Sequence, residues 1–238
     1  MELGFLKART ARKIMSINFS AQLPTLAKPG LLVMDVDATL IEEEVIDLLG
    51  EEAGLAEELS AITARAMRGE ITFGTSLRLR VSMLRDLSID ECRKRILQRI
   101  HVTKGAKLLV DYLHECGWKV GAVSGGFHEI LDELLPSLSI DFCAAHYLES
   151  RDGKLTGNVF GKIVDGDAKV DALKTWAHNL GIERAQTVAV GDGANDIAMI
   201  KYAGLGVAFC AKPAVEAATP YHICTRDLSA LLRFLNSK

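Results

Sequence analysis

Short, continuous runs of apolar residues recur along the chain, and the stretches between them place apolar residues at helical spacing. An apolar run without alternation is typical of a strand covered on both faces, as in a parallel sheet. Strands that alternate with helices predict an α/β fold with a doubly wound parallel sheet. The runs that predict its strands are Leu31–Met34, Val120–Val123, Thr187–Val190 and Gly206–Phe209.

The helical stretches show apolar residues three and four positions apart, which share one face of a helix. We expect these faces to cover the sheet. They are formed by Leu108, Leu109, Tyr112 and Leu113, by Ile130, Leu131, Leu134 and Leu135, and by Ala172, Leu173, Trp176 and Leu180.

Two segments interrupt the alternation of strand and helix. From about Glu43 to Arg99 the pattern predicts consecutive helices without a strand, inserted directly after the first strand as a small helical cap. Tyr147–Val164, with Asp152-Gly153 between polar alternations, predicts a β-hairpin. The expected division is an N-terminal extension (1–30), an α/β core (31–42 and 100–238) and the cap (43–99).

Two carboxylates, Asp35 and Asp37, follow the first predicted strand immediately. Acids two positions apart at a strand end repel each other unless a divalent cation binds them or they divide the work of nucleophile and general acid. Taken alone, the pair is more typical of a solvated turn that caps a helix.

Further polar groups follow the next predicted strands. Ser124-Gly125-Gly126 comes after Val120–Val123 and is expected to open a helix, where a hydroxyl and free backbone N–H groups cradle phosphate. Gly191–Asp196 follows Thr187–Val190, and its two acids and one amide suit an oxygen-ligated cation. Lys169 stands at the start of the intervening helix. Each feature also fits an ordinary turn or a surface charge.

Together these groups are more informative, because the carboxyl ends of parallel strands meet at one crevice. A nucleophile, metal-binding carboxylates, a phosphate cradle and a cation are the parts that phosphoryl transfer requires. The sequence therefore predicts a phosphoryl-transfer site at this edge of the sheet.

These motifs resemble those of the haloacid dehalogenase-like superfamily of aspartate-nucleophile phosphatases, and within it the phosphoserine phosphatases. The resemblance covers the chain from about Leu31 onward and implies a Rossmann-like core. The phrases that carry it most specifically are Ala122–Phe127, Val188–Asp196 and Ala208–Pro213. The activity it implies is hydrolysis of O-phosphoserine, the last step of serine biosynthesis.

The resemblance also implies roles for individual residues. Asp35 would be the nucleophile and Asp37 the general acid and base. Mg²⁺ would bind Asp35, the backbone carbonyl of Asp37 and Asp192, with Asp196 orienting the metal site or Lys169. The residues that would hold the phosphoryl group are Ser124, Gly125, Lys169 and Asn195.

In the cap, the resemblance implies that Glu44 receives the ammonium group of the substrate and that Arg80 grips its carboxylate. A guanidinium suits this task because it offers a carboxylate a bidentate fork. Met67 and Phe73 would form an apolar lid. Viewed alone, Glu44 and Arg80 are more typical of solvated helix faces.

The chain departs from the family at two positions. Phosphoserine phosphatases usually have Ser where this chain has Ala38, so one hydroxyl donor is lost and altered kinetics are expected. Relatives often have an acidic residue where this chain has Gly74, which leaves one contact in the cap unsupported.

The composition of the chain limits the kinds of molecule that it is expected to bind. A net charge of −3 gives no general attraction to nucleic acid or to anionic membranes, and no apolar run approaches the roughly 20 residues of a membrane span. The five cysteines are far apart, which favours free thiols in a reducing, cytoplasmic setting over a disulfide framework. The basic first 30 residues favour a solvated extension over a transit peptide. The chain is expected to be a monomer or a homodimer.

Two alternatives remain open from the sequence. The same chemistry would serve another small phosphomonoester, such as phosphohomoserine or a phosphorylated alcohol. A non-enzymatic phosphoacceptor module also combines an aspartate, paired acids, a hydroxyl and a lysine on a doubly wound sheet. It would lack the long helical insertion and the Gly191–Asp196 motif.

Overall fold

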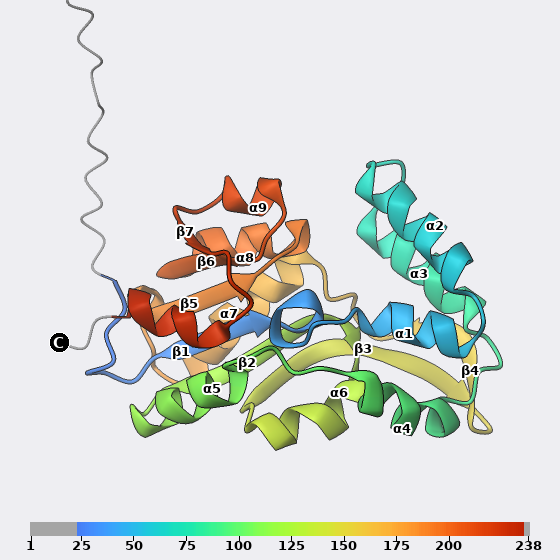
Figure 1. Ribbon diagram of the computed structural model, residues 1–238, viewed down its shortest axis with the longest axis horizontal. Coiled ribbons are helices and arrows are strands. Elements are labelled where there is room, and N and C mark those ends of the chain that lie inside the picture. Colours follow the sequence, from blue (N-terminus) through green and yellow to red (C-terminus); the bar gives the residue numbers. More distant parts are fainter. Residues whose placement is uncertain (1–22, 236–238) are drawn as a thin grey trace, which may run out of the picture.

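The predicted apolar runs form the centre of a seven-stranded sheet (Figure 1) in the computed structural model, which describes residues 23–235. The strand order is β4-β3-β2-β1-β5-β6-β7, and every pairing is parallel except that of β3 with β4. The expected doubly wound α/β fold is therefore confirmed. The strands are β1 Leu31–Asp35, β2 Lys119–Phe127, β3 Phe142–Arg151, β4 Lys154–Phe160, β5 Thr187–Gly191, β6 Leu205–Phe209 and β7 Tyr221–Ile223.

The order of the strands reverses at β1. The chain builds outward from β1 through β2 and β3, then returns to the other side of β1 for β5, β6 and β7. Such a reversal opens a crevice at the carboxyl ends of the two central strands, where open α/β sheets bind their ligands. In this chain the crevice lies beside the ends of β1 and β5.

Helices cover both faces of the sheet (Figure 1). Side chains of β1 alternate: Leu32 and Met34 join the core beneath α5 and α6, and Leu31 and Val33 join the core beneath α7 and α8. This is why the run is apolar throughout. The helices outside the inserted segment are α5 Ala106–Glu115, α6 His128–Leu134, α7 Gly166–Asn179, α8 Ile197–Tyr202 and α9 Pro213–Glu216.

The buried face of α5 differs from the expected one. Leu109 and Leu113 are buried as predicted, but Leu108 and Tyr112 are 58% and 42% exposed. Val110 is buried in their place. The buried stripe of the helix is formed by Ala106, Leu109, Val110 and Leu113, so the expectation for Leu108 and Tyr112 was wrong.

Four helices fill residues 45–99, and this segment contains no strand, as predicted. They are α1 Val45–Glu52, α2 Ala56–Met67, α3 Phe73–Met83 and α4 Ile89–Arg99. In Figure 1, α2 and α3 extend beyond the edge of the sheet, where α3 contacts β4, whereas α4 runs back toward α6. The two ends of the segment are joined by ion pairs from Arg95 and Arg99 of α4 to Glu52 of α1.

The hairpin predicted for 147–164 is present, but its first strand begins earlier. β3 starts at Phe142, pairs in parallel with β2, and then continues into the antiparallel pairing with β4. Its turn is made by Asp152 and Gly153, both with positive φ (52° and 76°), as a tight hairpin turn requires. Backbone bonds from Asp86 to Leu155 and from Leu155 to Leu87 fasten the hairpin to the end of α3.

The first 22 residues of the expected N-terminal extension lie outside the described residues. Residues 23–30 contact the core, where the side-chain amide of Gln186 donates to the carbonyl oxygens of Thr25 and Lys28. Leu23 and Leu26 pack on the core cluster. Between residues 23 and 235, no helix has the length and apolar character needed to cross a membrane.

Candidate active site at the carboxyl ends of β1 and β5

Asp35 is the last residue of β1 and is 4% exposed. One carboxylate oxygen, Oδ1, accepts the backbone N–H of Val36 at 2.8 Å and lies 2.8 Å from Nζ of Lys169. No partner for the other oxygen is found among the described residues. Burial, and then the charge of Asp196, raise the pKa of Asp35 well above its usual range. The acid therefore has one anchored oxygen and one that is available for reaction.

A tight turn, Val36–Leu40, carries the chain away from β1. Asp37 is extended within it, and Ala38 adopts the left-handed conformation with φ 53°. Both backbone groups of Ala38 are bonded: its N–H donates to Glu43, and its carbonyl accepts from Arg226 at 3.2 Å. These two bonds hold the backbone of the turn at Ala38.

Asp37 points back toward β2. Its Oδ1 accepts the backbone N–H of Val45 at 3.0 Å, and its Oδ2 accepts the hydroxyl of Ser124 at 3.4 Å. Burial is the main reason that the pKa of Asp37 is raised to about 6. A carboxyl with this pKa exchanges protons near neutral pH, as a general acid and base must.

Ser124, Gly125 and Gly126 do not open a helix, so that expectation was wrong. β2 remains extended to Phe127, and its pairing with β3 is irregular between Val123 and Phe127. The hydroxyl of Ser124 accepts the N–H of Gly126 at 2.7 Å. A Cβ at Gly126 would lie 3.3 Å from Oδ2 of Asp37, so a side chain there would crowd the acid.

Lys169, in the first turn of α7, is completely buried. Its Nζ lies 2.8 Å from Asp35 Oδ1 and 2.7 Å from Asp196 Oδ1. Burial alone favours the neutral amine, but the carboxylates of Asp196 and Asp35 outweigh it and raise the pKa of Lys169. A buried ammonium held by two acids provides a fixed positive charge beside the expected nucleophile.

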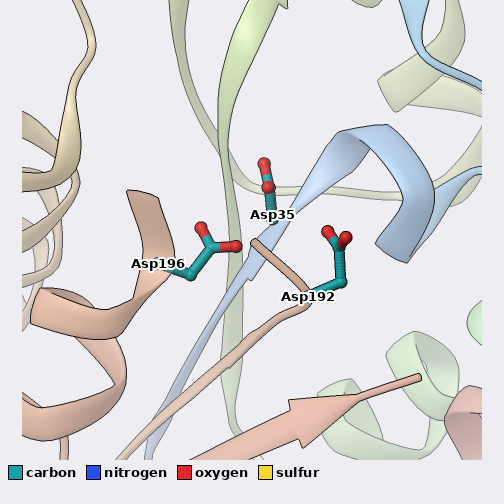
Figure 2. A group of neighbouring side chains, drawn as sticks. All are labelled: Asp35, Asp192 and Asp196. Atoms are coloured by element: carbon teal, nitrogen blue, oxygen red, sulfur yellow. The ribbon is translucent and has the colours of Figure 1, made fainter. Parts of the chain in front are cut away.

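Asp192 and Asp196 follow β5 and face Asp35 across the crevice (Figure 2). One carboxylate oxygen from each of the three residues lies within 4.8 Å of the others. Asp196 is already engaged, because its Oδ1 bonds Lys169 and its Oδ2 accepts the N–H of Gly193 at 3.0 Å. A Cβ at Gly191 would lie 2.4 Å from the carboxyl of Asp196, so the close approach requires glycine.

This group of oxygens fits a divalent cation. Burial raises the pKa of Asp192, and its carboxylate accepts a 3.4 Å bond from Thr39 and lies 3.7 Å from Nζ of Lys212. Buried Lys169 pairs with Asp35 and Asp196 and not with Asp192, so negative charge is in excess among these three carboxylates. Carboxylates in this arrangement are the ligands that hard divalent cations select.

Glu44 and Arg80 both approach the crevice from the inserted helices. Desolvation of the carboxyl, followed by the charges of Asp37 and Asp192, raises the pKa of Glu44 to about 8, although the residue keeps an exposed surface. Burial lowers the pKa of Arg80, and the charges of Asp47, Glu44 and Asp37 oppose that shift. Nε of Arg80 is buried and has no hydrogen-bond partner among the described residues.

The two residues expected to form a lid are placed differently. Phe73 begins α3, and a Cβ at Gly125 would be 3.4 Å from its ring, so the ring lies directly over the Ser124–Gly126 segment. Met67, at the end of α2, is 69% exposed. The backbone carbonyl of Gly74 accepts a 3.5 Å bond from the guanidinium of Arg78 in the same helix.

Asn195 lies in the short helical turn Ala194–Asp196, within the loop that carries Asp192. Three further residues at the site received no role from the sequence. Thr39 and Lys212 approach the carboxylate of Asp192. His146 bonds the Ser124–Gly126 segment. Thr39 belongs to the first motif, whereas a single histidine in a strand gives no such signal.

A model of the haloacid dehalogenase-like hydrolases matches residues 32–201. The chain belongs to that family, which confirms the resemblance drawn from its motifs. Two curated relatives are each named phosphoserine phosphatase. That of Lactococcus lactis subsp. lactis is 54% identical, over 89% of this chain and 97% of the relative. That of Streptococcus thermophilus is 55% identical, over 87% and 96%.

Solved structures agree with these relatives. A phospho-aspartyl intermediate analogue of a phosphoserine phosphatase superposes with a TM-score of 0.82 at 42% identity, covering 88% of this chain and all of that one. A substrate-bound phosphoserine phosphatase complex gives the same TM-score and identity, covering 88% and 99%. The similarity extends over nearly the whole length of both structures.

Proposed function

We propose that this chain hydrolyses O-phosphoserine to serine and phosphate through an aspartyl phosphate on Asp35. The observation that carries the proposal is the setting of Asp35. It lies at the switch point of the sheet with one oxygen anchored by buried Lys169, and Asp37, with a pKa of about 6, stands two residues away. The relatives named phosphoserine phosphatase support the choice of substrate.

In the first step, the available oxygen of Asp35 attacks phosphorus, and the bond between phosphorus and the serine oxygen breaks. Asp37 gives its proton to the departing serine oxygen. In the second step, Asp37 takes a proton from water, the water oxygen attacks the same phosphorus, and the bond to Asp35 breaks. Inorganic phosphate leaves, and both acids return to their starting states.

The phosphoryl group is held by Ser124, Gly125, Asn195 and Lys169 in this proposal. The fixed ammonium of Lys169 would offset the negative charge of the phosphoryl oxygens, and the hydroxyl of Ser124 would donate to one of them. Asp196 bonds both Lys169 and Gly193, so its task is to hold Lys169 in place.

We infer that the divalent cation is Mg²⁺, held by Asp35, the backbone carbonyl of Asp37 and Asp192. When bound, the cation neutralises phosphate charge and so permits attack by a carboxylate. The cluster of carboxylate oxygens around Asp35 and Asp192 supports a divalent cation, and the resemblance to the family supports Mg²⁺ as its identity.

Recognition of the amino acid falls to the inserted helices, and we propose that residues 43–99 act as a cap over the core. Glu44 would bind the substrate ammonium group, and Arg80, whose Nε has no partner among the described residues, would bind the carboxylate. Phe73 would cover the substrate above Gly125, and Met67 would join this lid only if the cap moves toward the core.

Phosphate release from a panel of small phosphomonoesters tests the proposal. O-phosphoserine should be turned over with the highest kcat/KM. Phosphoethanolamine, which lacks the carboxylate, and phosphohomoserine, which is longer by one methylene, should be poorer substrates. A preference for phosphohomoserine or for a simple phosphorylated alcohol would contradict the assignment while leaving the chemistry intact.

Two further points belong to the proposal. All five cysteines are free thiols, which supports a cytoplasmic location. We also propose that the chain works as a monomer or homodimer on a small-molecule substrate, without nucleic acid or membrane. The four inserted helices and the Gly191–Asp196 motif argue against a phosphoacceptor module.

A further inference from the structure

We propose that His146 is a positioning residue for the reaction. Its imidazole holds the Ser124–Gly126 segment in register with the start of α7, which carries Lys169. The inference rests on the proposed binding of phosphate by that segment. His146 lies in β3 and is 1% exposed. It belongs to none of the four motifs identified in the sequence, which are Asp35 with Asp37, Ser124–Gly126, Lys169 and Gly191–Asp196.

Both ring nitrogens of His146 are engaged. Nδ1 lies 3.1 Å from the carbonyl oxygen of Gly125 and 3.2 Å from that of Gly126, and Nε2 lies 2.8 Å from the backbone nitrogen of Val164. A carbonyl only accepts and a backbone N–H only donates, so one tautomer satisfies all three contacts: the proton is on Nδ1. Burial lowers the pKa of His146, which favours this neutral form.

The Ser124–Gly126 segment needs such support because the sheet does not provide it. β3 pairs Ala144 with Val123 and His146 with Phe127, so three residues of β2 face a single residue of β3. The regular ladder is interrupted where the phosphate would bind. The imidazole N–H of His146 supplies the bond that the ladder omits at Gly125 and Gly126.

The other ring nitrogen reaches the segment that leads into α7. Val164 is buried, and the next residue, Asp165, caps α7 by accepting the N–H of Ala168 at 3.0 Å. The N–H of Lys169 then donates to the carbonyl of Asp165. One imidazole therefore links the phosphate segment to the turn that bears the buried ammonium.

Aromatic rings fix the orientation of this imidazole. The ring of Phe73 lies 6.4 Å and that of Phe127 6.1 Å from it, centroid to centroid. Phe73 comes from the cap and also lies over Gly125. His146 thus stands between the proposed lid and the phosphate segment, where a small displacement would alter the position of the reacting group.

Three variants separate the two bonds. His146→Asn keeps a donor near the position of Nδ1, His146→Gln keeps an acceptor near the position of Nε2, and His146→Ala keeps neither. With O-phosphoserine we expect His146→Ala to lower kcat about 30- to 100-fold with a smaller change in KM, the scale of a misplacement of about 1 Å. Asn or Gln should recover part of that loss. A matched control is His114→Ala, whose imidazole bonds Asp141 at the opposite end of the same sheet and should leave kcat unchanged.

Two readouts do not depend on phosphoserine being the substrate. Turnover of p-nitrophenyl phosphate and affinity for inorganic phosphate should both be lower in His146→Ala than in the wild type. If the wild-type enzyme did not hydrolyse phosphoserine, the proposed substrate would be rejected, but these two measurements would still test the role of His146. Nitrogen NMR of the ring should show the Nδ1–H tautomer. Wild-type kcat in folded His146→Ala, no recovery in either Asn or Gln, or the Nε2–H tautomer would each overturn the proposal.

Discussion

Buried and half-buried carboxylates at the two ends of the parallel strands differ in the direction of their pKa shifts. At the carboxyl end, Asp35, Asp37 and Asp192 crowd together and their pKa values are raised. At the amino end, Asp141 accepts bonds from His114 at 2.7 Å, Lys119 at 2.6 Å and the N–H of Val120 at 2.8 Å. These bonds outweigh partial burial and lower the pKa of Asp141.

The opposite pKa shifts distinguish a site suited to chemistry, at the carboxyl end, from a site that stabilises the fold, at the amino end. Raised carboxyl pKa values mean that the folded state tolerates the desolvation of acids and, to a lesser extent, their mutual repulsion at one end, and such groups cluster at functional sites. A lowered pKa means that the folded state gains from the ionised acid at the other end. Removing an acid at the carboxyl end should therefore mainly lower activity, whereas removing Asp141 at the amino end should mainly lower stability.

The largest effect is expected for Asp35→Asn. Loss of the nucleophile should lower kcat by about 10⁴-fold or more. Because the raised pKa of Asp35 reflects an unfavourable charge in the folded state, its removal should leave the free energy of unfolding at pH 7 unchanged or increased. Steady-state phosphate release and thermal unfolding measure the two quantities, and a large loss of stability would contradict this account of the carboxyl end.

Lys169→Met should have the next largest effect, because it should lower both kcat and the free energy of unfolding. Two buried carboxylates would lose their shared partner, which costs on the order of 3–5 kcal/mol of stability. The loss of fixed positive charge should lower kcat by about 10²- to 10³-fold. Lys162→Met is the matched control, because Lys162 pairs with Asp171 at the surface. Equal effects in the two variants would show that the buried ammonium has no special role.

Glu44→Gln should act on KM rather than on chemistry. We expect KM for phosphoserine to rise about tenfold or more, as for loss of one charge-assisted bond. KM for p-nitrophenyl phosphate, which has no ammonium group, should not change. Glu42→Gln, at an exposed position two residues earlier, is the control. Parallel changes with both substrates would remove Glu44 from substrate recognition.

The smallest effect on activity is expected for Asp141→Asn, which should leave kcat and KM unchanged. It should cost about 1–3 kcal/mol of unfolding free energy at pH 7. A lowered carboxyl pKa contributes stability above the unfolded pKa of about 3.9, and this contribution disappears as the pH falls through the folded value. Denaturation at several pH values should therefore show wild type and variant converging below about pH 4. A difference that stays constant with pH would mean that the ionised carboxylate is not the source of the stability.

The strands and the four motifs were predictable because each depends on local sequence. Buried parallel strands are apolar throughout, and the residues that follow them must lie at one edge of the sheet. The segment 43–99 was equally predictable as helical from its length and spacing. The start of β3 was missed because it is defined by parallel pairing with a distant segment, β2, and β7 was missed because it has three residues.

What could not be predicted depends on contacts between distant segments. The complete burial of Lys169 follows from its two acids, one of them in β1 and the other after β5. The role of His146 arises from an irregular pairing of β2 with β3, which no spacing rule reveals. The extended form of Ser124–Gly126 has the same origin, because the pairing continues to Phe127 and delays the helix.

The central claim is that Asp35 carries the phosphoryl group during turnover. Rapid acid quenching after mixing the enzyme with ³²P-labelled phosphoserine and Mg²⁺, followed by peptide mapping, tests it directly. We predict a labelled peptide with phosphate on Asp35, formed and lost at rates compatible with kcat and absent in Asp35→Asn. Full turnover without a labelled protein, or a label on another residue, would contradict the account.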